Sequence, residues 1–273
     1  MSTTSRFSAR AEAPAACHPA MLCAMIAKPS GDILKDRILF VTGASGRLGR
    51  VASVACARHG ATVILCAKNL PSLEVIYDEI IRDGSPKPAI YAIDLNTAAE
   101  HDYDKLARTI EREFGVLHGL LHSAAAIAPL GPVSNIPVSD WSKVLNVNLN
   151  APFILTRVLL DLLQNSGDGT IVFTSDSAAR GKAAYWGAYA VSKIALEGFA
   201  AILADEFESS SKFRVNTLVP GPIDSPIRNQ AFPAENPRCR AHAQSLELLY
   251  TYLLGPNSRG QNARIFEAQD YIE

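Results

Sequence analysis

The feature that most constrains the fold of this chain is a regular alternation of short apolar runs with longer amphipathic segments, which begins after Asp32. The run "RILFVTG" (37–43) predicts a buried strand, and "RVASVACARHG" (50–60) predicts a helix that ends at a glycine. The same order repeats with a strand over 61–68, a helix over 70–84 and a strand over 88–95. Strands that alternate with helices in this way pair in parallel, and the helices cover both faces of the sheet.

The alternation continues to the C-terminal part of the chain. We expect helices over 104–114, 140–163 and 188–209, strands over 119–125, 169–176 and 214–221, and a less regular segment after them. The predicted fold class is therefore α/β, with a doubly wound parallel sheet of the Rossmann type in a single domain over 32–273. In this architecture ligands bind at the carboxyl ends of the strands, where this sequence places its Gly, Ser, Asp and Pro residues.

Composition and charge exclude several partners. The 273 residues are 48% hydrophobic and 19% charged, which fits one large globular domain. The formal net charge of −1 gives no overall field that would attract nucleic acid or anionic lipid, so any anion site must be built locally. Pro14, His18, Pro19 and Lys28 interrupt the apolar region near the N-terminus. We therefore expect neither a nucleic-acid partner nor a membrane span.

Residues 1–31 differ in composition from the rest, because Ser, Thr, Ala and Pro dominate and Glu12 is the only acid. We expect a disordered extension; an organelle-targeting segment, or a true start at Met21 or Met25, is the alternative. The five cysteines form no CxxC pair and no metal-ligand spacing with the six histidines. We therefore expect reduced thiols, no metal and a cytoplasmic location, or a mitochondrial one if the extension is a transit peptide.

The first strand-to-helix junction carries the glycine-rich stretch "VTGASGRLGR" (41–50). Gly43, Gly46 and Gly49 allow a tight turn, after which the N–H groups of a helix N-terminus can face a pyrophosphate. A plain tight connection is the alternative, but the position in the first β-α-β unit favours a nucleotide.

The end of the second strand indicates which nucleotide. An NAD site generally has an acid there for the ribose hydroxyls, whereas this chain has Ala67 and Lys68. A lysine suits the 2′-phosphate of NADPH, and Ser45 and Arg47 can add a hydroxyl and a second cation. Lys68 could also be a solvated loop residue. The missing acid independently favours NADP(H).

A tyrosine and a lysine lie one helical turn apart in "YAVSK" (189–193). We expect the Lys193 ammonium to lower the pKa of Tyr189, which makes the phenol a proton donor to a carbonyl or imine that accepts hydride. Such a pair is common by chance on exposed helices, so the surrounding motifs decide its meaning.

Those motifs occur in a recognisable order. They are the glycine loop, Asp94, Ser123 to Ala125, Asn148, the Tyr189 and Lys193 pair and the Pro220-Gly221 turn. Through these motifs the chain resembles the short-chain dehydrogenase/reductase family over 34–269. Within the family it is most similar to the YciK-type oxidoreductases of bacteria, through stretches such as "WGAYAVSK", "RVNTLVPGP" and "GPNSRGQNARIFEAQ".

The resemblance implies an NADP(H)-dependent oxidoreductase that acts on a small molecule and forms homodimers or homotetramers through its long helices. It implies Tyr189 as the acid/base, Lys193 as its pKa tuner and a ribose ligand, and Asn148 as the group that holds a water for proton relay. The implied cofactor-binding residues are Gly43, Ser45, Gly46, Arg47, Leu48, Gly49, Lys68, Asp94, Leu95, Ser123, Ala124, Tyr189, Lys193, Pro220, Gly221, Ile223 and Ser225.

The chain departs from the family pattern at three places. Asp176 stands where the family has its catalytic serine, Arg47 replaces the middle glycine, and "SAA" (123–125) replaces "NAG". An ionised aspartate can only accept hydrogen bonds, whereas a serine donates one to the substrate carbonyl. The first two departures occur together in the pteridine reductases of the same family.

Three functions therefore stay open at the level of sequence. They are a carbonyl or alcohol oxidoreductase in which Ser175 or Ser177 assists Tyr189, a pteridine-type reductase that uses Asp176, and an NADP-binding protein with little turnover. His122, inside an apolar strand, is expected to be a core residue rather than a catalytic one. The stretch "NQAFPAENP" (229–237) is expected to be a loop over the substrate cleft.

Overall fold

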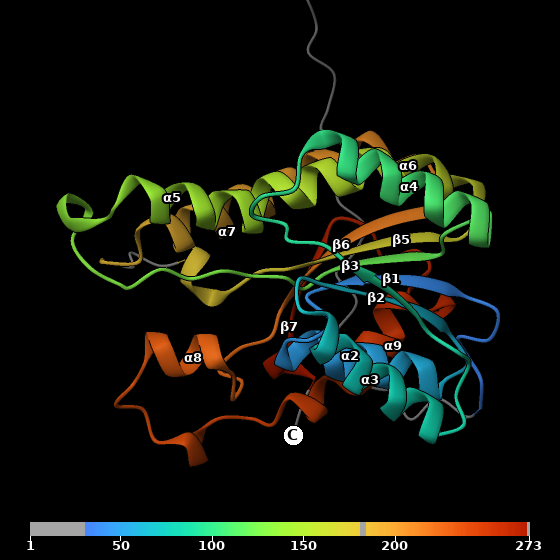
Figure 1. Ribbon diagram of the computed structural model, residues 1–273, viewed down its shortest axis with the longest axis horizontal. Helices are drawn as coiled ribbons and strands as arrows, with labels where there is room; N and C mark the ends of the chain where they lie inside the picture. The colour runs from blue at the N-terminus through green and yellow to red at the C-terminus, as the bar shows by residue number, and fades with distance from the viewer. Residues whose placement is uncertain (1–30, 181–183, 272–273) are drawn as a thin grey trace, which may run out of the picture.

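The computed structural model describes residues 31–180 and 184–271, which form one seven-stranded parallel sheet between two layers of helices (Figure 1). The order of the strands is β3-β2-β1-β4-β5-β6-β7. The strands are β1 (Ile38–Thr42), β2 (Thr62–Ala67), β3 (Ala89–Ala92), β4 (Gly119–His122), β5 (Gly169–Thr174), β6 (Phe213–Val219) and β7 (Arg264–Glu267). The predicted fold class is confirmed. The predicted extension, residues 1–31, lies outside the described residues except for Gly31 and stays a prediction.

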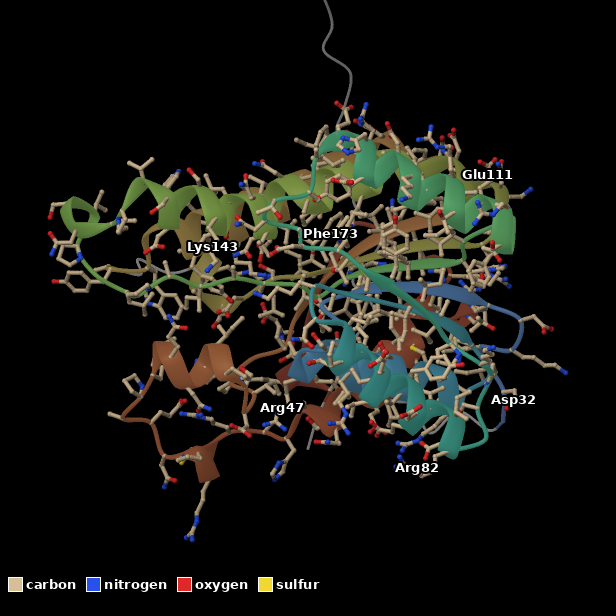
Figure 2. All side chains as sticks on the ribbon, in the orientation of Figure 1. Asp32, Arg47, Arg82, Glu111, Lys143 and Phe173 are labelled. Atoms are coloured by element: carbon tan, nitrogen blue, oxygen red, sulfur yellow. The ribbon has the colours of Figure 1, made fainter. Side chains whose placement is uncertain are left out.

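Helices cover both faces of the sheet. One layer contains α2, α3 and α9, and the other contains α4, α6 and α7, with α5 beside α7 (Figure 1). The bounds are α2 (Arg47–Arg58), α3 (Leu70–Arg82), α4 (Glu100–Phe114), α5 (Val138–Leu145), α6 (Ala151–Asn165), α7 (Gly187–Glu206), α8 (Pro226–Ala231) and α9 (Glu247–Leu254). The charged Arg82 and Glu111 lie on the outer sides of the two layers, and Phe173 lies between them (Figure 2).

The two hydrophobic cores follow from the two-residue period of the strands. Along β1, Leu39 and Val41 belong to the core under α2 and α9, whereas Phe40 belongs to the core under α4, α6 and α7. All three side chains are fully buried. A strand covered on both faces is mostly apolar, which is why β1 over 38–41 and β5 over 171–173 appear in the sequence as apolar runs.

Two of the predicted helices differ most from the observed ones. The helix predicted over 140–163 is interrupted by a π-helical turn (Asn146–Asn150) that separates α5 from α6. The helix predicted from residue 104 begins at Glu100, where an acidic first turn suits the positive end of the helix dipole and the Asp102 carboxylate accepts a hydrogen bond from the Ala99 N–H at 2.9 Å.

The segment expected to be less regular contains α9 and β7. The helix α9 has the sequence "ELLYTYLL", and six of its eight residues are buried, so it shows no apolar stripe that a 3.6-residue period could reveal. The strand β7 has only four residues and lies at the edge of the sheet. Both elements are defined by tertiary contacts rather than by a local pattern.

The helix α7 corrects one inference about membranes. With 20 residues and a mean hydropathy of 1.3 in its most apolar window, it is long and apolar enough to cross a bilayer, which the sequence argument had overlooked. Half of that window is buried in the protein, and Tyr189 and Lys193 lie inside it against the sheet. We therefore assign α7 as a core helix.

The order of the strands determines where a ligand site is expected, at the carboxyl ends of β1 and β4. The chain leaves β1 toward β2 on one side and later returns to β4 on the other, so the crossovers diverge where β1 meets β4. Because Thr42 pairs with His122 in this register, Gly43 lies against the backbone that follows β4. A Cβ atom at Gly43 would come within 2.6 Å of the Ala124 Cα, and its φ of +66° also favours glycine.

Candidate active site

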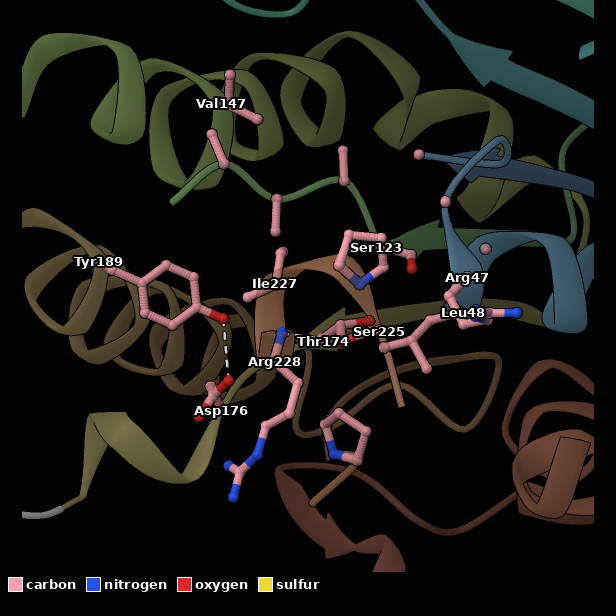
Figure 3. Close-up of a pocket in the computed structure, with 18 of the residues that line it drawn as sticks. Arg47, Leu48, Ser123, Val147, Thr174, Asp176, Tyr189, Ser225, Ile227 and Arg228 are labelled. Atoms are coloured by element: carbon pink, nitrogen blue, oxygen red, sulfur yellow. Dashed lines mark hydrogen bonds between the residues drawn. The ribbon is translucent and has the colours of Figure 1, made fainter. Parts of the chain in front are cut away.

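A cavity of about 560 Å³ opens at the carboxyl ends of the strands. It is lined by the glycine loop, the ends of β2 to β6, and parts of α5, α7 and α8 (Figure 3). Nearly all of the predicted site residues line it together: Gly43, Ser45, Gly46, Arg47, Leu48, Gly49, Lys68, Asp94, Leu95, Ser123, Ala124, Asp176, Tyr189, Lys193, Pro220, Gly221, Ile223 and Ser225. Of the predicted residues only Asn148 does not line this cavity.

The glycine loop has the geometry of a phosphate-binding turn. A Cβ atom at Gly49 would come within 2.3 Å of the Gly43 carbonyl oxygen, so the turn closes only around glycine. Gly46 caps α2 without any side-chain hydrogen bond, which leaves the first N–H groups of the helix available to an anion. Arg47 is the first residue of α2 and has a helical backbone, so it does not need the freedom of the glycine it replaces.

Two cations stand where a phosphate would approach. Lys68 follows β2 and is exposed, and Arg47 is half-exposed at the start of α2, on the side that faces α8 (Figure 2). The Arg47 guanidinium lies 3.5 Å from the Asp224 carboxylate, which also lies 3.7 Å from the buried Arg240. The single contact to Asp224 leaves most of the Arg47 N–H donors free for a ligand.

The end of β4 leaves one hydroxyl without a partner. The Thr42 hydroxyl accepts hydrogen bonds from the Ser123 and Ala124 N–H groups at 3.1 and 3.2 Å, which fixes this backbone beside the glycine loop. The Ser123 Oγ is buried and has no protein partner among the described residues. Because an unpaired buried hydroxyl is costly, this atom indicates a missing ligand or water.

Tyr189 and Asp176 meet directly in the cavity (Figure 3). The Tyr189 hydroxyl donates to Asp176 Oδ2 at 2.9 Å, and Asp176 Oδ1 accepts from the Ala178 N–H at 2.9 Å. Burial and the adjacent Asp176 carboxylate raise the pKa of Tyr189 well above its ordinary value. The expectation that a cation lowers this pKa was wrong, because the charge that contacts the phenol is negative.

Lys193 lies behind this pair. Its Nζ atom is 5.7 Å from the centre of the Tyr189 ring and donates to the Thr174 carbonyl oxygen at 2.8 Å. Burial lowers the pKa of Lys193 to about 8, against the opposing influence of Asp176 and Glu197. A lysine with this pKa changes its charge close to neutral pH, so the positive charge of the site depends on pH.

The side chain of Asn148 is fully used in contacts within the protein. It lies in the π-helical turn, is 1% exposed, and exchanges hydrogen bonds with the Ala126 backbone: Oδ1 accepts from N–H at 2.7 Å and Nδ2 donates to C=O at 2.9 Å. Nδ2 also donates to Ser192 Oγ at 3.0 Å. Both amide hydrogens are therefore used, and any water-holding role, which stays a prediction, must use other atoms of this turn.

The two serines beside Asp176 do not point at the phenol. Ser175 Oγ donates to Glu197 Oε1 at 2.5 Å, and the exposed Ser177 lies 3.4 Å from Asp176 Oδ1. The carboxylate is thus the group that this segment presents to Tyr189.

An aromatic wall faces Tyr189. Trp186 lies with its ring centre 5.7 Å from that of Tyr189 and 5.5 Å from that of Phe232. The Arg228 guanidinium covers Phe232 at 3.7 Å and pairs with Glu235. Sequence reasoning missed Arg228 and Phe232, and the only signal was that Phe232 falls in the predicted cleft loop.

His122 is a core residue, as predicted. It is 2% exposed, stacks on Phe173 with ring centres 4.8 Å apart, and lies 3.0 Å from Thr156 Oγ1 through Nε2. Burial lowers the pKa of His122 to about 3, so the ring is neutral in the folded protein at ordinary pH.

Comparison with known proteins agrees with this geometry. The family described as short chain dehydrogenase matches residues 37–236, which is most of the chain. The chain belongs to this family. It is a family of oxidoreductases, and this chain carries the family's motifs at the carboxyl edge of its sheet.

Among its relatives is the uncharacterized oxidoreductase YciK of Escherichia coli strain K12, 39% identical over 89% of this chain and 95% of the relative. A solved short chain dehydrogenase of Shigella flexneri complexed with NADP is 39% identical, covers 88% of this chain and 100% of that chain, and has a TM-score of 0.85. One from Escherichia coli CFT073 complexed with NADPH is 40% identical with the same coverage and TM-score.

Proposed function

We propose that the protein is an NADPH-dependent reductase that transfers hydride to a small carbonyl or C=N substrate, with Tyr189 as the proton donor. The observation that carries the proposal is the contact of Tyr189 with Asp176 in the cavity, with the buried Lys193 behind it. A phenol that is held by a hydrogen bond inside a cavity and lies beside a cation can act as a general acid.

The cavity fits a dinucleotide with an additional phosphate. The uncapped N-terminus of α2 suits a pyrophosphate, and the unpartnered Ser123 hydroxyl supplies a hydrogen bond toward a ligand. Lys68 and Arg47 favour a 2′-phosphate over a bare ribose, and β2 ends without a competing carboxylate. When bound, the reduced nicotinamide supplies the hydride, and Pro220, Gly221 and Ser225 line the same cavity as Tyr189.

The protein residues then control one proton. A substrate atom that becomes negative as hydride adds takes the proton of the Tyr189 hydroxyl, which must turn away from Asp176 to donate it. A protonated Lys193 stabilises the phenolate that remains. Trp186 and Phe232 cover the apolar part of the substrate and keep water from the reacting atoms.

The Asp176 carboxylate favours a second candidate substrate for the same hydride transfer. A carboxylate repels a developing alkoxide but attracts a protonated imine and accepts from an N–H group. A nitrogen heterocycle of the pteridine type, whose N–H groups pair with Asp176, is therefore the specific alternative to a carbonyl substrate. The carboxylate oxygen is available from the cavity, where Asp176 is only partly buried.

We also propose that the protein forms a homo-oligomer through α6 and α7. Val191, Ile194 and Ile202 of α7 are 44%, 52% and 62% exposed, and Phe153 of α6 is 48% exposed. Phe153 packs edge-on against Phe199 of α7 with ring centres 5.7 Å apart, which makes the surface continuous. A second copy of the same face would bury this apolar surface.

A cytoplasmic location remains our proposal. Cys56, Cys66 and Cys239 are free thiols in the described part of the chain, as expected in a reducing compartment.

Replacement of Tyr189 by phenylalanine tests the proposed function. With NADPH and a panel that contains dihydrobiopterin and small diketones, we expect the Y189F variant to lose at least about a hundredfold in kcat and to retain its NADPH affinity, because only the donated proton is lost. Tyr185→Phe is the matched control, since that exposed phenol precedes α7 and lies outside the cavity lining. Full activity of Y189F would remove the mechanism, and NADPH binding by the wild type without turnover would favour a binding protein.

A further inference from the structure

Three side chains of α7, each one helical turn from the next, hold three consecutive residues at the end of β5. Tyr189 bonds to Asp176, Lys193 bonds to the Thr174 carbonyl oxygen, and Glu197 bonds to Ser175. Positions four residues apart lie on the same face of a helix, so this face of α7 is fastened to the segment that carries Asp176. The mechanism uses the first two of these contacts and assigns nothing to the third.

Glu197 holds that segment at both ends. Its Oε1 atom accepts from the buried Ser175 hydroxyl at 2.5 Å, immediately before Asp176. It also pairs with Arg180, whose Nη2 and Nε atoms lie 3.3 and 3.4 Å from the two carboxylate oxygens. Between these two anchors lies the 3₁₀ turn (Ser177–Ala179) that Asp176 caps by accepting from the Ala178 N–H.

The bond to Glu197 decides which side chain faces the phenol. Ser175 carries a hydroxyl of the kind that would assist a carbonyl reductase, but this hydroxyl donates to Glu197 and is not free to donate to a substrate. The backbone at Asp176 is extended, with φ −150° and ψ 148°, so the direction of the Asp176 side chain follows from that of its neighbour Ser175. Because Glu197 fixes Ser175, it also fixes the direction of Asp176, whose carboxylate bonds to Tyr189 on the same face of α7.

We propose that Glu197 is a positioning residue that sets the register of the Ser175 to Arg180 segment, so that the Asp176 carboxylate and not the Ser175 hydroxyl contacts Tyr189. The inference rests on the proposed function of Tyr189. It assigns to Glu197 a part in selecting between a substrate that donates to Asp176 and one that accepts from a serine.

The charge of Glu197 also acts on Lys193. The charged and titratable groups that face Lys193 are Asp176 from the segment after β5, and Tyr189 and Glu197 from its own helix. Both carboxylates raise the pKa of Lys193 against the larger effect of burial. Arg180, which pairs with Glu197, also pairs with Glu267 at the end of β7. Glu267 is therefore a suitable control residue for Glu197, because its carboxylate also pairs with Arg180 but contacts neither Ser175 nor Lys193.

The test compares Glu197→Gln with Glu267→Gln. For E197Q we expect kcat to fall about tenfold and the basic limb of the pH profile of kcat/KM to move to lower pH by about half a unit, because Lys193 loses a neighbouring negative charge. A crystal structure of Glu197→Leu, whose side chain cannot accept from Ser175, should show the Tyr189 Oη to Asp176 Oδ2 separation beyond hydrogen-bond distance. E267Q should retain the wild-type profile and the 2.9 Å contact.

Glu197→Asp separates position from charge and serves if E197Q does not fold. The shorter side chain keeps the negative charge but withdraws from Ser175, so kcat should fall while the pH profile stays in place. Equal behaviour of E197Q and E267Q, together with an intact Tyr189 to Asp176 contact in E197L, would overturn the inference. A fully active Y189F variant would instead remove the proposed function, and the crystallographic comparison of the Glu197 variants would still report on the register.

Discussion

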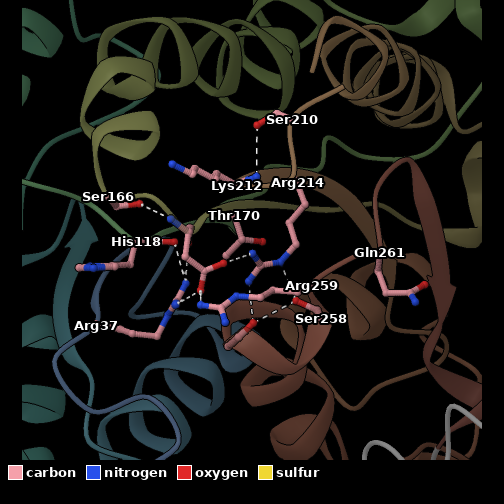
Figure 4. A network of polar contacts seen from close by, with 12 residues as sticks. Arg37, His118, Ser166, Thr170, Ser210, Lys212, Arg214, Ser258, Arg259 and Gln261 are labelled. Atoms are coloured by element: carbon pink, nitrogen blue, oxygen red, sulfur yellow. Dashed lines mark hydrogen bonds and ion pairs between the residues drawn. The ribbon is translucent and has the colours of Figure 1, made fainter. Parts of the chain in front are cut away.

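Two aspartates at opposite ends of β5 show how the two edges of the sheet differ: one carboxylate is paired within the protein and the other faces the cavity. Asp168 precedes the strand and accepts from Arg37 at 2.5 Å, from Arg214 at 2.6 Å and from Arg259 at 3.0 Å (Figure 4). Although burial opposes ionisation, the hydrogen bonds and charges of Arg259, Arg214 and Arg37 hold the pKa of Asp168 at about 2. Asp176 follows the strand and receives one phenol and one backbone N–H.

The two carboxylates differ in how many of their hydrogen-bond acceptor positions are occupied by protein groups. The oxygens of Asp168 are enclosed by guanidinium groups that also bind backbone carbonyls, such as those of His118 and Gly255, so this edge of the sheet is tied together. Asp176 is partly buried, and a cavity lies in front of it. A fully paired carboxylate stabilises a fold, whereas one with unused acceptor capacity is available to a ligand.

Replacement of Asp168 by asparagine should give the largest effect on stability. Because three guanidinium groups lose their counter-charge in a buried site, we expect the free energy of unfolding in D168N to fall by about 3 kcal/mol, as measured by urea denaturation. NADPH affinity of the folded protein should stay within about twofold. Asp161→Asn, at an exposed position of α6, is the matched control and should change stability by less than about 0.5 kcal/mol.

The sign of the pH effect follows from the lowered pKa. The folded pKa of Asp168 is about 2 and the ordinary value is 3.8, so its contribution is complete above pH 4 and is lost as the pH falls from there toward 2. D168N should lack this part of the acid sensitivity. An unchanged stability in D168N would show that the two carboxylates do not differ in the way we describe.

Replacement of Asp176 by serine should separate the two substrate classes. We expect D176S to lower the pKa of Tyr189, since the adjacent negative charge is removed, and to lose about a hundredfold in the reduction of a pteridine-type C=N bond. Reduction of a diketone should be retained or improved. Urea denaturation should show a stability change below about 1 kcal/mol, in contrast to D168N. Equal loss with both substrates would contradict a selective role for this carboxylate.

Replacement of Lys68 by alanine should weaken NADPH binding about tenfold and leave NADH binding unchanged, because only NADPH carries the 2′-phosphate. Fluorescence titration at two salt concentrations measures the effect, which should shrink at high salt. Lys87→Ala is the control at an exposed position before β3. Equal weakening of both cofactors in K68A would place the phosphate elsewhere.

The smallest expected effect concerns His122, which lies at the carboxyl edge but belongs to the core. Its folded pKa of about 3 lies below the ordinary 6.5, so the unfolded chain binds a proton that the folded protein does not. Stability should therefore decrease as the pH falls below 6.5, by about 1 kcal/mol between pH 6.5 and 5.5. A His122→Gln variant should lose this part of the slope in thermal unfolding measurements and keep the part from His118, because burial lowers the pKa of His118 as well. An undiminished slope in H122Q would assign it to another group.

The sequence predicts the sheet and the cofactor side of the cavity well, because both depend on local patterns. Strands such as β1 are continuous apolar runs, and a glycine loop at the first strand-to-helix junction places Gly43 and Gly49 without tertiary information. The helix α9 was missed because a helix buried on nearly all sides has no stripe to detect.

The chemistry of the catalytic side was harder to predict, because hydrogen-bond direction is a tertiary property. The spacing of Tyr189 and Lys193 correctly predicts one helix face, but it cannot show that the phenol donates to Asp176 and the ammonium to the Thr174 carbonyl. The prediction that the pKa of Tyr189 is lowered was wrong, because burial and the Asp176 carboxylate raise it. Glu197 follows the same four-residue spacing, yet only the folded chain brings it to Ser175.

The measurement that tests the account most directly is a fluorescence titration of the wild-type protein with NADPH and with NADH. We predict saturable binding of NADPH at least about tenfold tighter than that of NADH, because Arg47 and Lys68 line the cavity beside an uncapped α2 and β2 ends without an acid. Equal affinity for the two cofactors, or no binding of either, would contradict the assignment of the carboxyl edge of the sheet as an NADPH site.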